Sequence, residues 1–238
     1  MKNRISIIQI MFCSALIAFF QIEYLYAQDT IYLRNPSFED KPRSGSVYSS
    51  PIKDWTDCGL TNFPDESPPD IFSSRVSYWG VELKPYEGKT YLSVVTRYND
   101  SYESISQSLS KPVEAGKCYR LTVFLALAEK YESGTSRMPL VEFHEGNRYG
   151  TRTATENFSN PVELFIWGGD ASCRTHQLLV RSGPVSNHDW SQYELEFSPK
   201  ETYQFITIGA YFEKGYKEPY NGHVLVDDLS PIIEIECK

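Results

Sequence analysis

The stretch "CYRLTVFLALAE", residues 118–129, decides the fold class. Its apolar side chains fall on every second position from Tyr119 to Leu127, while Arg120 and Thr122 begin the alternate set. Successive side chains of a β-strand point to opposite faces of a sheet. The stretch is therefore predicted to be a β-strand with at least one buried face.

Eight further stretches show a related pattern and are separated by turn-rich segments. They are residues 30–35, 90–97, 104–110, 162–168, 176–182, 192–198, 203–212 and 223–230. Nine short strands without a convincing amphipathic helix predict an all-β chain, folded as an antiparallel β-sandwich or jelly roll. No internal repeat or linker divides the chain, so a single domain over residues 29–238 is the simplest interpretation.

The N-terminal segment is predicted to be a secretory signal peptide. Lys2 and Arg4 precede an apolar run, and Ala27 supplies a small residue at a cleavage point. Polar residues interrupt the run, and a membrane span needs about 20 clean apolar residues, so an uncleaved anchor is the less favoured alternative. With residues 1–27 removed, we expect an exported protein without a membrane span, located in the periplasm, on the outer cell surface or outside the cell.

The charge and the cysteines narrow the classes of partner. The formal net charge of −8 becomes −9 when Lys2, Arg4 and Glu23 leave with the signal peptide. An acidic surface disfavours nucleic acid and anionic lipid as partners. In an exported chain the remaining cysteines predict disulfides, with all three connectivities open; these cysteines are Cys58, Cys118, Cys173 and Cys237.

The sequence offers little for catalysis. It contains no G-x-S-x-G elbow, and its histidines have neither H-E-x-x-H nor H-x-H spacing. His188 and Asp189 are adjacent, which favours a turn over a catalytic pair. Two carboxylates about 5–9.5 Å apart would suit glycoside hydrolysis, but nothing in so acidic a chain singles out a pair. We therefore expect no enzymatic activity, with a glycoside hydrolase or esterase as the third-ranked function.

Aromatic residues make up 14% of the chain, enough to supply more than a core. Sugar rings stack on Trp and Tyr, and their hydroxyls need amide or charged partners. The aromatic candidates are Trp79, Tyr86, Trp167, Tyr216 and Tyr220, and the polar candidates are Asp65, Glu66, Asp70, Arg97 and Asn221. The alternative is structural, because "FPDESPPDIF" (residues 63–72), within the long connection over residues 51–86, could simply be a rigid proline-rich cover over a sheet edge.

Motifs at both ends of the chain resemble a known group of domains. "NPSFED" (residues 35–40), "IKDWTDC" (52–58) and "GHVLVDDLSPI" (222–232) are similar to the ends of galactose-binding-like β-sandwich domains, which include several carbohydrate-binding modules. "ISQSLSKPVEAGKCYRLTVFLA" (105–126) resembles their recurrent strand pair. A narrower similarity, to exported envelope proteins of gliding-type Gram-negative bacteria, rests on the blocks at 57–71, 91–97, 166–173 and 219–227.

The resemblance implies a structural calcium ion between the first and last strands. Its side-chain ligands would be Glu39 and Asp227, with Asp228 as the alternative to Asp227. Calcium takes six to eight oxygen ligands, and two carboxylates would neutralise it. Strand alternation allows only one of the two aspartates to face that side. The other interpretation is that Glu39 and Asp227 are strand-end carboxylates bonded to backbone amides.

Together these observations predict a non-catalytic exported binding module. Its partner is expected to be a glycan or another component of the cell envelope. The alternative is a structural or adhesive envelope protein that binds protein or peptidoglycan.

Overall fold

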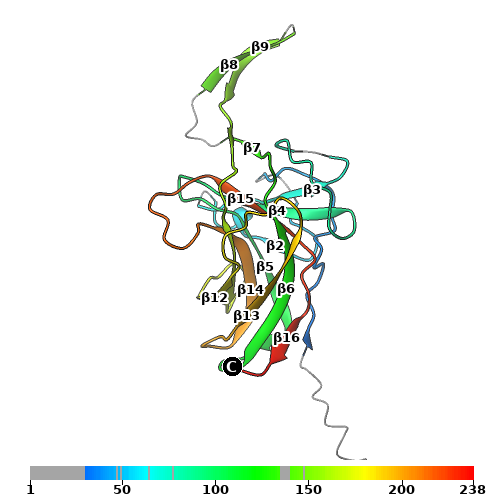
Figure 1. Ribbon diagram of the computed structural model, residues 1–238, viewed down its shortest axis with the longest axis vertical. Helices are drawn as coiled ribbons and strands as arrows, with labels where there is room; N and C mark the ends of the chain where they lie inside the picture. The colour runs from blue at the N-terminus through cyan, green and yellow to red at the C-terminus, as the bar shows by residue number, and fades with distance from the viewer. Residues whose placement is uncertain are drawn as a thin grey trace, which may run out of the picture.

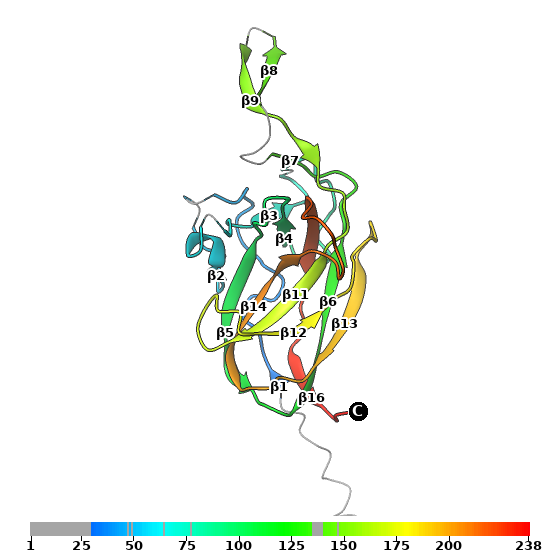
Figure 2. The same ribbon diagram turned by 90° about the vertical axis from the view of Figure 1, so that its left-hand side faces the viewer.

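The chain folds into two antiparallel β-sheets packed face to face (Figure 1, Figure 2). This computed structural model describes residues 30–238 except 47, 49, 64, 77, 135–139 and 147. The predicted signal peptide, residues 1–27, lies outside the described residues. Within the described part of the chain, no helix is long and apolar enough to cross a membrane.

The larger sheet, sheet A, has seven strands. They are β1 (Thr30–Ile31), β3 (Asp70–Ser73), β4 (Thr90–Thr96), β6 (Cys118–Ala126), β13 (Ser191–Phe197), β15 (Gly222–Asp227) and β16 (Ile232–Ile235). Their order is β1-β16-β6-β15-β4-β3, with β13 on the other edge of β6. β1 pairs with β16 through Thr30 opposite Ile233, so the first described strand lies beside the last.

The smaller sheet, sheet B, has five strands in the order β12-β11-β14-β5-β2. They are β2 (Thr56–Asp57), β5 (Ser104–Val113), β11 (Glu163–Gly169), β12 (Gln177–Arg181) and β14 (Tyr203–Tyr211). Figure 2 shows β12, β11, β14 and β5 side by side in front of sheet A. A 3-10 turn, η1 (Cys58–Leu60), follows β2.

The main core lies between the two sheets. On β6 the side chains from Tyr119 to Leu125 alternate as expected, with Leu121 and Val123 almost fully buried and Arg120 and Thr122 partly exposed. Sheet B contributes a matching row, in which Ile166 of β11 pairs with Ile208 of β14 and that residue pairs with Ile105 of β5. The predicted all-β antiparallel sandwich is therefore confirmed.

A second apolar cluster explains the long connection before β4. Phe72, Tyr91 and Leu225 belong to it, and Tyr78 and Leu83 of the connection pack against it. Alternation puts Tyr91 on the side of β4 opposite the core residues Leu92 and Val94. The connection thus covers the outer side of sheet A rather than running free in solvent.

A long hairpin was not predicted from the sequence. Strands β8 (Leu140–Glu145) and β9 (Arg148–Thr153) pair only with each other among the described residues and project beyond the end of the sandwich opposite the C-terminus (Figure 1). The small pair β7 (Glu132–Ser133) and β10 (Glu156–Asn157) lies at its base. The hairpin's alternation is weak because both faces are largely exposed, so no buried face marks it in the sequence.

Two disulfides tie distant segments together. Cys58 of η1 bonds to Cys173 in the loop between β11 and β12, and Cys118 at the start of β6 bonds to Cys237 after β16. The first joins the two edge regions of sheet B, and the second fixes the C-terminal segment to the central strand of sheet A. The structure thus selects one of the three connectivities that the sequence left open.

Replacing Cys118 and Cys237 by serine is expected to lower the free energy of unfolding by about 2–5 kcal/mol, because the cross-link restricts the unfolded chain over a long loop. The sequence separations of the two bonds are 119 and 115 residues, so the Cys58→Ser/Cys173→Ser pair should lose a similar amount. Urea unfolding measures both losses. Peptide mapping without reductant should recover one cross-linked peptide pair that joins Cys58 to Cys173 and another that joins Cys118 to Cys237. Any other pairing of these cysteines would contradict the fold.

Candidate functional site

Glu39 and Asp227 hold the same backbone turn from two sides. The Asp227 carboxylate accepts hydrogen bonds from the Tyr86 and Glu87 amides at 2.9 and 3.0 Å. The Glu39 carboxylate accepts hydrogen bonds from the Lys89 and Thr90 amides at 2.7 and 3.1 Å. We call this arrangement of Glu39, Asp227 and residues 86–90 the clasp. It joins the start of the described chain to its last strands through the turn before β4.

Local sequence explains why the clasp forms. Gly88 has a φ of +64°, and a Cβ at this position would collide with the Glu39 carboxylate, so only glycine fits. Asn35 fixes the other side, because its Oδ1 accepts a hydrogen bond from the Glu39 amide at 2.8 Å. The carbonyl of Pro36 accepts one from the Leu229 amide at 3.2 Å. The "NPSFED" and "LVDDLS" motifs therefore meet in the structure.

The chemistry of the clasp fits a cation only in part. Burial raises the pKa of the Asp227 carboxyl to about 7, and the charge of Asp228 adds to the effect. Neither Glu39 nor Asp227 forms an ion pair within the described residues, so a divalent cation would supply missing positive charge. However, the same residues contain no group of three or more His, Cys, Asp or Glu side chains suited to a metal. Calcium would need backbone carbonyl ligands as well, and it stays a prediction.

Asp70, Trp79 and Arg97 belong to one buried polar network. The Trp79 indole and the Tyr131 hydroxyl donate to Asp70 Oδ2 at 2.9 and 2.5 Å. Arg97 pairs with Glu103 at 2.7 Å and donates to the Ser67 hydroxyl at 2.9 Å. Burial raises the pKa of Glu103 to about 8 although the Arg97 charge opposes this. The network ties the long connection to sheet A, and Trp79 is its most exposed member, with 38% exposure.

Three other predicted binding residues, Tyr86, Tyr220 and Asn221, lie outside this network, and each makes contacts of its own. Tyr86 stacks on Phe124 of sheet A with ring centroids 3.5 Å apart. Tyr220 donates its hydroxyl hydrogen to the Pro161 carbonyl at 2.9 Å. The buried Asn221 accepts a hydrogen bond from the Tyr98 amide at 3.0 Å and donates to the Glu156 carboxylate at 2.5 Å. These contacts anchor loops to the body of the protein.

Trp167 lies in a group of aromatic residues on the outer side of sheet B, which we call the aromatic face. Its members are Tyr102, Phe165, Trp167, Tyr211 and Tyr216. The rings contact each other in sequence, with centroids 6.4 Å apart for Tyr102 and Trp167, 5.3 Å for Trp167 and Phe165, and 5.2 Å for Phe165 and Tyr211. Tyr102, Trp167 and Tyr211 are half-buried and Tyr216 is 38% exposed, so parts of several rings face solvent.

Strand pairing explains why these side chains share a face. Trp167 lies opposite Thr207, and Phe165 lies opposite Gly209, whereas Ile166 between them points into the core. Ser104 and Ser106 of β5 continue the two rows. Bulky rings on β11 therefore stand beside small residues on β14 and β5.

A polar cavity of about 470 Å³ adjoins this face. Its lining residues are Asp65, Asn99, Asp100 and Ser101. The Tyr102 amide donates to the Asp65 carbonyl at 3.3 Å, which fixes the ring beside the cavity. The Asn99 Oδ1 accepts hydrogen bonds from the amide and hydroxyl of Ser101 at 3.2 and 2.7 Å. Exposed ring surface and polar groups thus lie together at one end of the sandwich.

Sequence reasoning named Asp65, Trp167 and Tyr216 but missed Tyr102, Phe165, Tyr211, Asn99 and Asp100. Phe165 could have been found, because it lies two positions before Trp167 on the same strand and so shares its face. The others depend on which strands become neighbours. That information is not local in the sequence.

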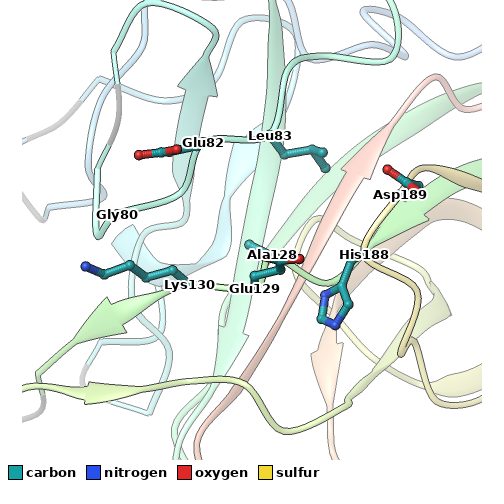
Figure 3. Close-up of a pocket in the computed structure, with 8 residues that line it drawn as sticks. All are labelled: Gly80, Glu82, Leu83, Ala128, Glu129, Lys130, His188 and Asp189. Carbon is teal, nitrogen blue, oxygen red and sulfur yellow. The ribbon is translucent and has the colours of Figure 1, made fainter.

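A second concavity, of about 480 Å³, lies between residues 80–83 and 128–130 (Figure 3). His188 Nδ1 lies 2.9 Å from the Leu127 carbonyl, so Nδ1 carries the hydrogen. Figure 3 shows the carboxylates of Glu82 and Asp189 at opposite ends, neither directed at the imidazole ring. No serine, threonine or cysteine is among the described residues that line it. The cleft therefore lacks an arranged acid–base pair.

No protein-family model and no curated protein matches the sequence. A solved structure of a cyclase from Fischerella sp. TAU is similar, with a TM-score of 0.51, 12% identity, and coverage of 89% of this chain and 100% of the cyclase. The structure of the CBM22-1 and GH10 modules of Clostridium thermocellum endo-1,4-β-D-xylanase 10B, complexed with xylohexaose, has a TM-score of 0.40 and 10% identity. The match covers 84% of this chain and 30% of the xylanase chain. The structure of the K3 cleaved adhesin domain of Lys-gingipain from Porphyromonas gingivalis has a TM-score of 0.44 and 8% identity. The match covers 87% of this chain and 99% of the adhesin domain.

The similarity to the cyclase corrects one prediction. The absence of familiar motifs led us to expect that the chain is not an enzyme, and that conclusion is wrong. A fold that covers 89% of this chain is also the fold of an enzyme, so missing motifs do not exclude catalysis. At 12% identity the likeness concerns the fold and carries no activity over to this chain.

Calcium is expected to raise the melting temperature relative to a sample in EDTA, because an ion that binds only the folded state at about 100 times its Kd adds about 2.7 kcal/mol. Differential scanning calorimetry with calcium, magnesium and EDTA measures the effect. Asp227→Asn should abolish the calcium gain, whereas Asp228→Asn should keep it if Asp227 is the ligand. Overlapping melts of the wild-type protein would remove the calcium hypothesis.

Arg97→Met and Glu103→Gln are each expected to lower the free energy of unfolding by about 3–5 kcal/mol, because each leaves a buried charge without its partner. The double variant Arg97→Met/Glu103→Gln should lose less than the sum, since no unpaired charge remains. Urea unfolding at pH 9, above the pKa of about 8 for Glu103, gives the three values with the carboxyl ionised. Additive losses would show that the pair is not coupled.

Proposed function

We propose that the protein is exported and binds carbohydrate on the aromatic face of sheet B. The observation that supports this most directly is the row of half-buried rings from Tyr102 through Trp167 to Tyr211 beside a polar cavity. Sugars combine apolar C–H faces with hydroxyl edges, so a site needs both ring surface and hydrogen-bonding groups. This arrangement offers both.

Two further observations support export and a carbohydrate partner. The two disulfides are typical of proteins in oxidising compartments. The resemblance of the terminal motifs to galactose-binding-like domains agrees with a carbohydrate partner at the cell envelope. The proposed structural cofactor is a calcium ion held at the clasp by Glu39 and Asp227.

The β8–β9 hairpin favours a second candidate, an adhesive envelope protein that binds other proteins. Leu140 is 70% exposed and Tyr149 is 81% exposed on this projecting arm. Exposed apolar side chains on an extended strand pair suit protein contacts. A glycan array without hits, together with envelope proteins that co-purify only when the hairpin is present, would favour this candidate.

Trp167→Ala is expected to weaken glycan binding by about tenfold, which corresponds to about 1.4 kcal/mol, because a central aromatic contact is lost. A glycan array identifies the best-bound oligosaccharide, and isothermal titration calorimetry then measures the affinity. Tyr86→Ala is the matched control, since Tyr86 is 47% exposed but stacks on sheet A. Equal affinity of Trp167→Ala and wild type, with loss in Tyr86→Ala, would move the site away from the aromatic face.

A further inference from the structure

The polar cavity beside the aromatic face carries negative charge at its wall. Asp65 and Asp100 are both exposed, and neither forms an ion pair within the described residues. The nearest arginine along the chain, Arg97, is committed to Glu103 at 2.7 Å. Any sugar bound on the rings next to this cavity therefore meets two uncompensated carboxylates.

The position of Asp100 is fixed by a tight turn. Its amide donates to the Arg97 carbonyl at 2.9 Å, and the Arg97 amide donates to the Ser101 carbonyl at 2.8 Å. Asp100 has a φ of +66°, a left-handed conformation in which Asp and Asn are the favoured non-glycine residues. The turn thus fixes the backbone position from which the carboxylate extends.

The field of Asp100 reaches the aromatic face. Burial raises the pKa of Tyr211 to about 12, and the Tyr216 hydroxyl and then the Asp100 charge add to the rise. Burial also raises the pKa of Tyr102, and Asp100 is among the charges that contribute. The two tyrosines that flank the cavity therefore both sense this carboxylate.

We propose that this cavity makes the aromatic face selective for glycans without negative charge, and that Asp100 is the residue that sets the selectivity. The inference rests on the proposed function and adds the substrate class. Neutral hydroxyls can donate to the two carboxylates, and no described hydrogen bond uses the Asn99 amide nitrogen, which can donate to a sugar oxygen. A uronate, sialyl or sulfate group placed there would face like charges. Asp65, which lines the same cavity, adds the second carboxylate.

The experiment compares pairs of probes that share a sugar backbone, one member charged and the other neutral. Oligogalacturonate hexamers and their fully methyl-esterified forms share one backbone, and a sulfated galactan hexasaccharide with its desulfated form gives a second pair. Calorimetric titration at about 20 mM and 300 mM salt measures both members of each pair, because screening at high salt should reduce a charge effect. The wild-type protein should bind each charged member at least about tenfold more weakly at low salt, a margin of about 1.4 kcal/mol.

Asp100→Asn should narrow this ratio to about threefold. The ratio of the two affinities is the measured quantity, so a change in affinity that is common to both members of a pair does not alter it. Asparagine tolerates the positive φ, so the turn should be kept. Glu82→Gln, in the cleft of Figure 3, removes a carboxylate away from the aromatic face and should leave the ratio unchanged.

Two results would overturn the inference. One is equal affinity of the wild-type protein for both members of each pair. The other is an unchanged ratio in the Asp65→Asn/Asp100→Asn double variant. If instead the wild-type protein binds neither these probes nor any glycan on an array, the proposed function fails and the selectivity fails with it. If the wild-type protein binds both members of a pair with equal affinity and Trp167→Ala loses this binding, the proposed function stands and only the selectivity is rejected.

Discussion

The backbone amides of residues 86–90 are the point on which the architecture depends. Two carboxylates from opposite ends of the described chain accept hydrogen bonds from four of these amides, two each. Each carboxylate holds two of these amides, so the turn keeps its position against sheet A only while both carboxylates are in place. Because the turn leads directly into β4, the clasp fixes this strand of sheet A relative to both terminal segments. Glu39 is therefore first an architectural residue, whatever ion it also binds.

Sheet B serves two purposes with one strand. In β11, Leu164 and Ile166 fill the core, while Phe165 and Trp167 form the aromatic face. The period of two therefore places the core and the candidate site on opposite sides of the same backbone. A ring in the site is positioned by the packing of its neighbours in the core. Ring positions held in this way cost a ligand little ordering on binding.

Much of the fold follows from local sequence, and less of the site does. The alternation in residues 118–129 identifies β6, and the terminal motifs identify the meeting of the first and last strands. The β8–β9 hairpin has no buried face to mark it, and the cysteine pairing depends on distances that no local pattern contains. The aromatic face combines Tyr102 after β4, Trp167 on β11 and Tyr211 on β14, so it exists only once the strand order is known. Asp70 and Arg97 were predicted to hydrogen-bond a sugar, but both lie in a buried polar network. Their burial depends on the segment that covers the strand, which the local sequence does not show.

The pairing of β1 with β16 also governs the order of events as the chain is made. Until residues 227–237 have left the ribosome, the turn at 86–90 lacks Asp227, β1 lacks its paired strand β16, and Cys118 lacks Cys237. The N-terminal half therefore cannot reach its final form during synthesis, and its apolar strands stay unprotected until the last segment arrives. The pairing of the first described strand is therefore a late event in folding, because it needs a contact between the two ends of the described chain.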